Sequence, residues 1–184
     1  MERFIMQDLI AWKNRKDRKP LILLGARQVG KTYILKEFGQ REFENVAYIN
    51  CDNNAMAKDL FASDYNIDRI LLTIGAITGV NIEAGKTLII MDEIQELHRG
   101  LASLKYFCEN AREYHVAVAG SLLGLALHQG ESYPVGKVNT LEMYPMTFEE
   151  FLWARGFKQR MDLLQHGMWD VVKSLRTLYI QHLR

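Results

Sequence analysis

Gly25-Ala26-Arg27-Gln28-Val29-Gly30-Lys31-Thr32 fits the pattern G-x-x-x-x-G-K-[ST] in full, and it directly follows the apolar run Pro20-Leu21-Ile22-Leu23-Leu24. A short apolar run of this kind is typical of a buried strand. The glycines allow successive backbone N–H groups to face an anion, and the following helix directs its positive end toward the same point. This stretch therefore predicts a phosphate-binding loop between a strand and a helix.

The last residues of this loop fit the chemistry of a nucleoside triphosphate. We expect Lys31 to reach the β- and γ-phosphates. We expect Thr32 to place its hydroxyl on Mg²⁺, which neutralises charge as the γ-phosphoryl group leaves. The residues expected to bind the nucleotide are Gly25, Ala26, Arg27, Gln28, Val29, Gly30, Lys31, Thr32 and Tyr33.

A second apolar run, Thr87-Leu88-Ile89-Ile90-Met91, ends in the adjacent carboxylates Asp92 and Glu93. Successive strand residues point to opposite faces, so two adjacent acids can take different roles at the end of a strand. We expect Asp92 to bind the Mg²⁺ shell and Glu93 to act as the general base that faces the attacking water. The alternative is an acidic pair that merely begins an exposed turn.

Length and composition favour one soluble domain. The chain has 184 residues, 48% of them hydrophobic and 24% charged, and no apolar stretch approaches the roughly 20 residues needed to cross a bilayer. The N-terminal sequence lacks a signal-peptide pattern, so we expect a cytoplasmic protein with no membrane partner. Cys51 and Cys108 are then expected to be reduced thiols.

The charge balance gives no reason to expect a nucleic-acid partner. Lys and Arg number 23 and Asp and Glu number 22, for a net charge of +1. A local basic cluster precedes the first expected strand and comprises Lys13, Arg15, Lys16, Arg18 and Lys19. It could touch phosphates or an acidic partner, but a solvated basic helix end is the commoner explanation.

Hydrophobic periodicity predicts helices that alternate with strands along the chain. Strands are expected at residues 20–24, 46–50, 87–93, 115–119 and near 138–143. Helices are expected at 5–12, from the phosphate loop to Gly39, through 67–79, through 101–111, and from 148 to Gly156, the last begun by a capping box at Thr147-Phe148-Glu149-Glu150. We therefore predict an α/β fold with a parallel sheet covered by helices on both faces. The phosphate loop, Asp92, Glu93 and Ser121 would all follow strand ends.

The residues present favour ATP over GTP. The sequence has no Asn-Lys-x-Asp motif to read guanine and no Asp-x-x-Gly where a GTPase switch would need it. A small-molecule kinase is the main enzymatic alternative, because it shares the phosphate loop. Glu93 argues against a kinase, since an acid directly after Asp92 suits the activation of water.

Four motifs in order carry a family resemblance. They are the phosphate loop, Asp92-Glu93-Ile94-Gln95, Gly120-Ser121-Leu122-Leu123-Gly124 and Pro145-Met146-Thr147-Phe148-Glu149-Glu150-Phe151, with Pro134-Val135-Gly136-Lys137-Val138 as a further similar segment. On these motifs the chain resembles a bacterial and archaeal family of AAA-like P-loop ATPases over roughly residues 1–156. The resemblance implies a three-layer α/β/α sandwich with sheet order 5-1-4-3-2. Family members usually continue into a C-terminal domain, and we expect residues 157–184 to be a helical extension that is the start of that region, a remnant of a lid or the product of a truncation.

The resemblance also suggests two further catalytic residues. Ser121 looks like a polar sensor that orients the attacking water or contacts the γ-phosphate, and its alternative is an ordinary helix N-cap. Lys137 stands where the family often has an Arg that stabilises the transition state from the same or a neighbouring subunit. A lysine lacks the bidentate fork of arginine. Arg27, inside the loop, is an alternative source of that charge.

Together these features predict Mg²⁺-dependent binding and hydrolysis of ATP, with Lys31, Glu93, Ser121 and Lys137 as catalytic residues and Thr32 and Asp92 as metal ligands. The alternative is a nucleotide-gated switch or interaction module in which hydrolysis is incidental. The expected partners are ATP or ADP, with further copies of the chain or a missing C-terminal domain.

Overall fold

The computed structural model describes residues 2–52, 54–61, 64–120 and 134–156. It separates into two compact units, of which one is residues 5–145 and the other is residues 1–4 with 146–184. Ser121 and the extension at 157–184 lie outside the described residues. The division into 1–156 and 157–184 therefore stays a prediction.

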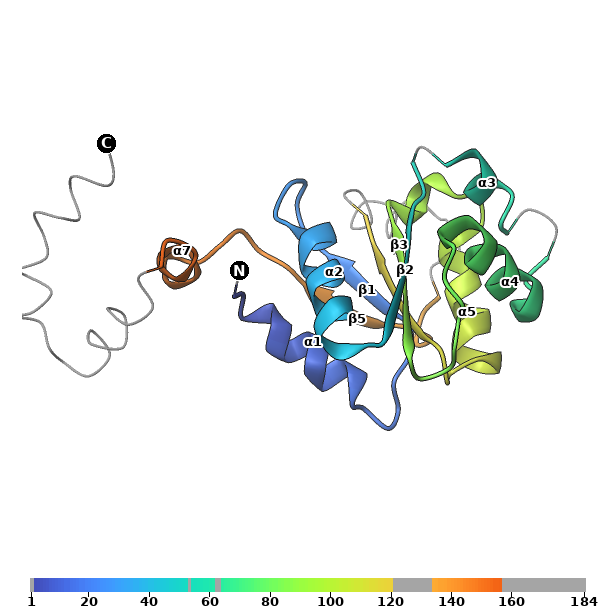
Figure 1. Ribbon diagram of the computed structural model, residues 1–184, viewed down its shortest axis with the longest axis horizontal. Coiled ribbons are helices and arrows are strands. Elements are labelled where there is room, and N and C mark those ends of the chain that lie inside the picture. Colours follow the sequence, from blue (N-terminus) through green and yellow to red (C-terminus); the bar gives the residue numbers. More distant parts are fainter. Residues whose placement is uncertain (1, 53, 62–63, 121–133, 157–184) are drawn as a thin grey trace, which may run out of the picture. The chain divides into compact units, whose positions relative to one another are not determined.

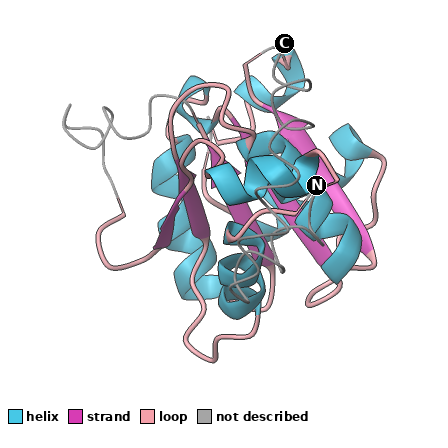
Figure 2. Ribbon diagram, turned by 90° about the vertical axis from the view of Figure 1, so that its left-hand side faces the viewer, coloured by secondary structure: helices cyan, strands magenta, loops and turns pink. Residues whose placement is uncertain are grey.

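The larger unit is built on a parallel sheet of five strands (Figures 1 and 2). The strands are β1 (Leu21–Leu24), β2 (Asn45–Asn50), β3 (Thr87–Asp92), β4 (His115–Ala119) and β5 (Asn139–Glu142). Their order across the sheet is β2-β3-β4-β1-β5. This is the predicted order 5-1-4-3-2 read from the other edge, so the predicted fold class is confirmed.

Helices cover both faces of this sheet. They are α1 (Ile5–Lys13), α2 (Lys31–Glu42), α3 (Ala55–Lys58), α4 (Ile67–Thr78), the 3-10 turn η1 (Ile94–Glu96) and α5 (Gly100–Asn110). The helices α1 and α2 lie on one face, and α4 and α5 lie on the other (Figure 1). All six residues of β3 are buried, as expected for a central strand that is packed on both sides.

The helix α2 corrects one expectation. Gly39 does not end this helix, which continues to Glu42. A Cβ at position 39 would lie only 2.6 Å from Cγ2 of Val46 and 3.2 Å from Cδ2 of Leu88. At Gly39, α2 therefore lies close against the sheet, and the missing side chain serves packing rather than termination.

His115 begins β4 among aromatic side chains. Its ring lies 6.0 Å from that of Trp12 and 4.8 Å from that of Phe43, in edge-on arrangements. Burial, followed by the nearby charges of Arg18 and Lys13, lowers the pKa of His115 to about 4. The imidazole is accordingly neutral in the folded protein near pH 7.

The basic cluster before β1 is engaged with its surroundings. Lys13 Nζ lies 3.1 Å from Glu42 Oε2, and Arg15 pairs with Asp17 at 3.0 Å. Lys19 Nζ donates to the Gly136 carbonyl at 2.7 Å. These contacts fit the interpretation of a basic helix end. Both cysteines are buried and free, as expected.

The smaller unit joins the N-terminal residues to α7 (Phe148–Ala154). The predicted capping box is confirmed, because Thr147 Oγ1 accepts from Glu150 N at 3.2 Å and Glu150 Oε2 accepts from Thr147 N at 2.9 Å. Glu150 Oε1 also accepts from Phe4 N at 2.8 Å and lies 3.1 Å from Arg3 Nε, with both charged side chains buried. Burial raises the pKa of Glu150, but the bonds from Thr147, Phe4 and Arg3 outweigh it and hold that pKa below its usual value.

No helix among the described residues has both the length and the apolar character required to cross a bilayer.

Candidate functional site

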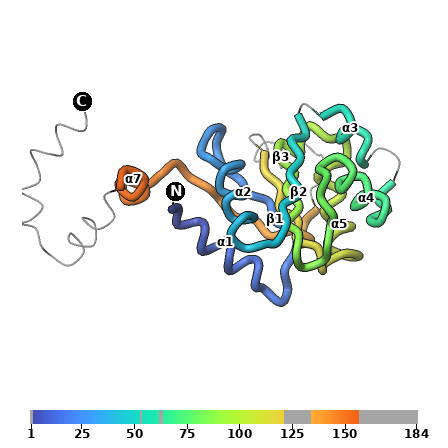
Figure 3. Tube along the Cα trace, viewed as in Figure 1, coloured from blue at the N-terminus to red at the C-terminus, as the bar shows by residue number. Residues whose placement is uncertain are grey.

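The loop between β1 and α2 has a backbone that glycine makes possible, and it forms the blue bend above α2 in Figure 3. Gly25 has φ +150°, and Gly30, which precedes α2, has φ +99°. A Cβ on Gly25 would lie 2.3 Å from the carbonyl oxygen of Met143, so no other residue fits there. Gln28 adopts the left-handed region with φ +64°. The loop therefore has the conformation that the two glycines of the motif predict.

The side chain of Lys31 lies folded against this loop. It is 6% exposed, and its Nζ donates to the carbonyl oxygens of Gly25 and Ala26, each at 2.8 Å. Burial lowers the pKa of Lys31, whereas the carboxylates of Glu93 and Asp92 oppose that shift. The ammonium group is thus placed inside the loop and is electrostatically close to both acids at the end of β3.

Thr32 and Asp92 are in direct contact. Thr32 Oγ1 donates to Asp92 Oδ2 at 2.5 Å, and Asp92 is 5% exposed. Tyr48, on the neighbouring strand β2, donates its hydroxyl to the same Oδ2 at 3.3 Å. Burial first, and then the charge and hydrogen bond of Asp92, raise the pKa of Tyr48 to about 12, so its hydroxyl remains a donor.

The oxygen atoms of Thr32 and Asp92 are suitable ligands for Mg²⁺. A hydroxyl oxygen and a carboxylate oxygen converge, and hard oxygen ligands are what Mg²⁺ prefers. Within the described ranges, no group of three or more His, Cys, Asp or Glu residues could hold a metal by itself. This agrees with the usual mode for Mg²⁺, which relies on one or two protein ligands, phosphate oxygens and water.

Glu93 comes directly after Asp92, but it lies in a turn and not in the strand. The strand ends at Asp92, and Glu93 adopts a left-handed conformation with φ +53° and ψ +46°, from which η1 begins. Its backbone N–H donates to Asp92 Oδ1 at 3.2 Å. The two acids are therefore separated by a turn of the backbone, so the alternation argument used for them does not apply.

The carboxylate of Glu93 is held by Gln95. Gln95 Nε2 donates to Glu93 Oε2 at 2.6 Å, and the other amide atom, Gln95 Oε1, is buried without a partner in the described part of the chain. Gln95 belongs to the Asp-Glu-Ile-Gln motif, but the sequence assigned it no role. Tyr48 was missed as well, because a tyrosine on an edge strand carries no local signal that it reaches Asp92.

The remaining predicted residues are more scattered. Arg27 is exposed on the loop, and Tyr33 is 45% exposed with its hydroxyl hydrogen-bonded to Glu37 one turn further along α2. Lys137 precedes β5, whose Asn139 N donates to the carbonyl of Pro20 before β1.

That register places Lys137 at the amino edge of the sheet, while Lys31, Thr32 and Asp92 meet at the carboxyl edge. Lys137 instead pairs with Glu109 at 2.8 Å. The structure therefore does not bring Lys137 to the phosphate loop of its own chain.

A family model described as AAA domain matches residues 17–152, which is most of the chain and includes the site above. The chain belongs to this AAA domain family. Membership supports nucleotide binding by the AAA domain, in agreement with the phosphate loop.

An uncharacterized protein of Methanocaldococcus jannaschii is 30% identical to this chain over 153 residues, covering 74% of this chain and 28% of that protein. Two solved structures share the fold. A Walker-type ATPase of Pyrococcus abyssi has a TM-score of 0.53 at 18% identity, covering 84% of this chain and 57% of the other. The ORC1 protein of Aeropyrum pernix, solved in complex with DNA, has a TM-score of 0.52 at 14% identity, covering 84% and 47%. The chain thus spans only part of each of these proteins.

Proposed function

We propose that this AAA domain binds ATP with Mg²⁺ and hydrolyses it to ADP and phosphate. The contact between Thr32 Oγ1 and Asp92 Oδ2 carries the proposal, because it joins the hydroxyl of the phosphate loop to the carboxylate at the end of β3. Family membership and the fold of the solved neighbours support the same conclusion.

In this proposal, Lys31 gives up hydrogen bonds within the protein to bind ATP, and the other residues of the site bind the metal or the attacking water. Lys31 leaves the carbonyls of Gly25 and Ala26 and meets the β- and γ-phosphates. Thr32 and Asp92 would hold Mg²⁺, which supplies charge neutralisation at the phosphates. Glu93 accepts a proton from the attacking water at its carboxylate, and Gln95 keeps that carboxylate oriented.

Two variants test the proposal. Lys31→Ala should abolish ATP binding at micromolar concentrations in calorimetry, whereas Lys58→Ala, which removes an exposed lysine of α3, should leave the affinity unchanged. Glu93→Gln should retain ATP binding and lose phosphate release, whereas Glu96→Gln, at an exposed acid of η1, should retain both. Normal turnover by Glu93→Gln would show that the base lies elsewhere.

The hydrogen bond between Gln95 and Glu93 favours a second candidate, a nucleotide-gated switch. In this candidate the bond holds the Glu93 carboxylate inactive until a partner binds, whereas in the hydrolysis proposal the same bond orients the base, so the kcat of Gln95→Ala separates the two candidates. For such a switch, amide hydrogen exchange in η1 and α5 should differ between the ADP-bound and ATP-bound Glu93→Gln protein, and the unmodified chain should release phosphate at the background rate. Identical exchange patterns in both states would refute it.

The chain spans 28% of the curated relative, so the activity of a longer protein and its assembly are also proposals. Without a cation that stabilises the transition state, the rate of phosphoryl transfer can be lower by a factor of about 10³ to 10⁵. We propose that a second copy or a further domain supplies this cation. Specific activity that rises with protein concentration would support a second copy, and specific activity that stays constant would exclude it.

Cytoplasmic location stays a prediction.

A further inference from the structure

A pocket of about 640 Å³ lies on the α4 and α5 face of the sheet. Its volume falls within the roughly 300–1,000 Å³ that small-molecule sites occupy. The first half of α5 forms one wall, and Tyr65 and the segment before β5 form others. The residues proposed to bind ATP do not line it, so the pocket is separate from the phosphate loop.

The charged residues that line this pocket are basic. The cations Arg99, Lys105 and Lys137 line it, and no described lining residue carries a carboxylate. Glu109 contacts Lys137 at 2.8 Å but does not itself line the pocket. Such a concentration of positive charge in a concave site favours an anionic ligand.

Aromatic side chains supply the other half of the recognition surface. The rings of Tyr65 and Tyr106 are stacked, with centroids 4.1 Å apart and planes inclined by 16°. The guanidinium of Arg99 lies 4.3 Å from the centroid of the Tyr65 ring, and Arg99 Nε donates to the Tyr65 hydroxyl at 3.0 Å. Flat aromatic and guanidinium groups beside positive charge are the combination that binds bases and phosphates of single strands.

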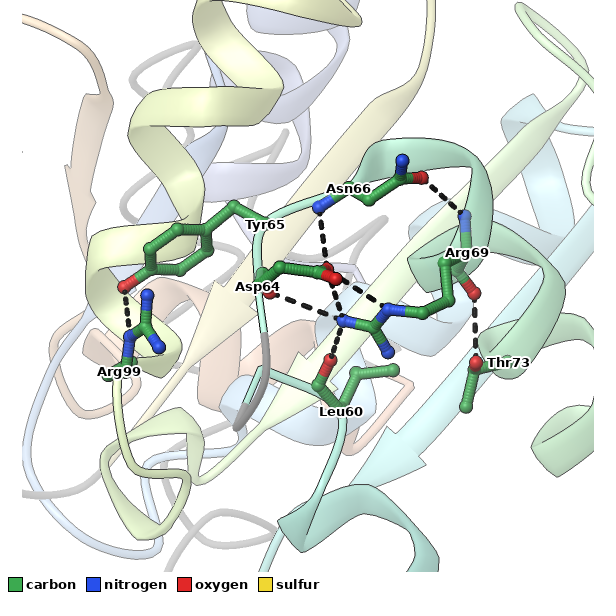
Figure 4. Close-up of polar contacts among 7 residues, drawn as sticks. All are labelled: Leu60, Asp64, Tyr65, Asn66, Arg69, Thr73 and Arg99. Carbon is green, nitrogen blue, oxygen red and sulfur yellow. Dashed lines mark hydrogen bonds and ion pairs between the residues drawn. The ribbon is translucent and has the colours of Figure 1, made fainter.

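This wall is held in place by contacts outside the pocket (Figure 4). Arg69 donates to the Leu60 carbonyl at 3.0 Å and to Asp64 Oδ1 at 2.8 Å, while Asn66 Oδ1 accepts from Arg69 N and caps α4. Tyr65 lies between the two anchored residues Asp64 and Asn66. Its position is therefore fixed before any ligand arrives, which lowers the entropic cost of binding.

We propose that this pocket binds a nucleotide unit, a phosphate-bearing sugar with a planar base, presented as a free mononucleotide or within single-stranded nucleic acid. Lys105 and Lys137 meet the phosphate, and the base packs against the stack that Tyr106, Tyr65 and the Arg99 guanidinium already form. An acidic peptide would satisfy the charges but would leave the aromatic wall without a planar partner. The proposal is independent of ATP hydrolysis.

The test uses the full chain carrying Lys31→Ala, without Mg²⁺, so that the phosphate loop does not contribute. The probe is a fluorescein-labelled oligothymidylate of about 12 nucleotides, followed by anisotropy at low salt. Lys105→Glu should weaken binding at least about tenfold. Lys16→Glu, a matched reversal at an exposed lysine of the basic cluster, should change it less than about twofold. Circular dichroism melting verifies that both variants fold.

Two competitors identify the source of the ligand. Displacement by thymidine monophosphate indicates a free nucleotide, and displacement by unlabelled oligothymidylate alone indicates a single strand. The proposal is wrong if neither nucleotide probe binds, or if Lys16→Glu weakens binding as much as Lys105→Glu. It is also wrong if labelled oligoglutamate binds as tightly with the same sensitivity to Lys105→Glu.

Discussion

Replacing Gly39 by alanine should destabilise the protein, although alanine is the better helix former. Gly39 lies within α2, where an alanine would gain about 1 kcal/mol of helix propensity. Against this, its Cβ would lie 2.6 Å from Val46 Cγ2, 3.3 Å from Val46 Cγ1 and 3.2 Å from Leu88 Cδ2. Rotation of the Val46 side chain would only bring its other methyl group close to the new Cβ. Leu88 is fully buried, so it has little room to move away.

Overpacking of this kind costs about 1–3 kcal/mol, so the clash outweighs the propensity and the net loss should be about 1 kcal/mol. For a chain of 150 to 250 residues, each kcal/mol lowers the melting temperature by about 2–4 °C. Removing the obstructing methyl groups should reverse the effect. Val46→Ala destabilises by itself, but Gly39→Ala added to it should then cost nothing or stabilise.

Urea and thermal unfolding of the two single variants and the double variant give the coupling free energy between positions 39 and 46. We expect a favourable coupling of about 1 kcal/mol. A Gly39→Ala protein more stable than the unmodified chain, or strictly additive effects in the double variant, would refute the close approach of α2 to the sheet.

Three further outcomes follow from contacts described above. Gln95→Ala should lower kcat about tenfold with little change in KM, because Glu93 loses its orienting bond; steady-state kinetics with an unchanged kcat would contradict this. Glu150→Gln should speed exchange of the Phe4 amide about 100-fold, the equivalent of about 3 kcal/mol, because one partner of the buried pair between Arg3 and Glu150 is lost. Unchanged exchange would contradict the contact between Glu150 and Phe4. His115 has a folded pKa of about 4 against an ordinary value of 6.5, so the unfolded chain takes up the proton first as pH falls. Stability should be full above about pH 6.5 and fall by up to about 3 kcal/mol toward pH 4, and His115→Phe should flatten that slope in denaturant titrations.

The fold was predictable because its signals are local and ordered. The strand before Gly25 and the strand that ends at Asp92 contain continuous apolar runs, as is typical of buried parallel strands. The strand order followed from the family resemblance. Gly39 was misread because a glycine that ends a helix and a glycine that allows close packing look alike in sequence. Only the position of Val46 across the helix–sheet interface distinguishes them.

The chemistry of the site was predictable only in part. Thr32 and Asp92 meet as two separate motifs suggested, but the turn at Glu93 overrides strand alternation through its left-handed backbone. The basic and aromatic pocket was invisible because Tyr65, Tyr106 and Lys137 come from segments far apart in the chain. The net charge of +1 for the whole chain gives no sign of this local cluster of basic residues.

Only a short segment that contains the turn η1 separates Glu93 from α5, the helix that lines the pocket. Glu93 leads through η1 directly into α5, and a Cβ on Gly100 would lie 2.8 Å from the Ile94 carbonyl oxygen and 3.0 Å from Leu97 Cβ. Close packing of this kind resists relative movement, so a shift of Glu93 would be passed through η1 to the first turn of α5, which lines the pocket. Linkage between two sites is reciprocal. A nucleotide at the phosphate loop and an occupant of the pocket would then change each other's affinity by the same factor, and titrating either one would report on the other.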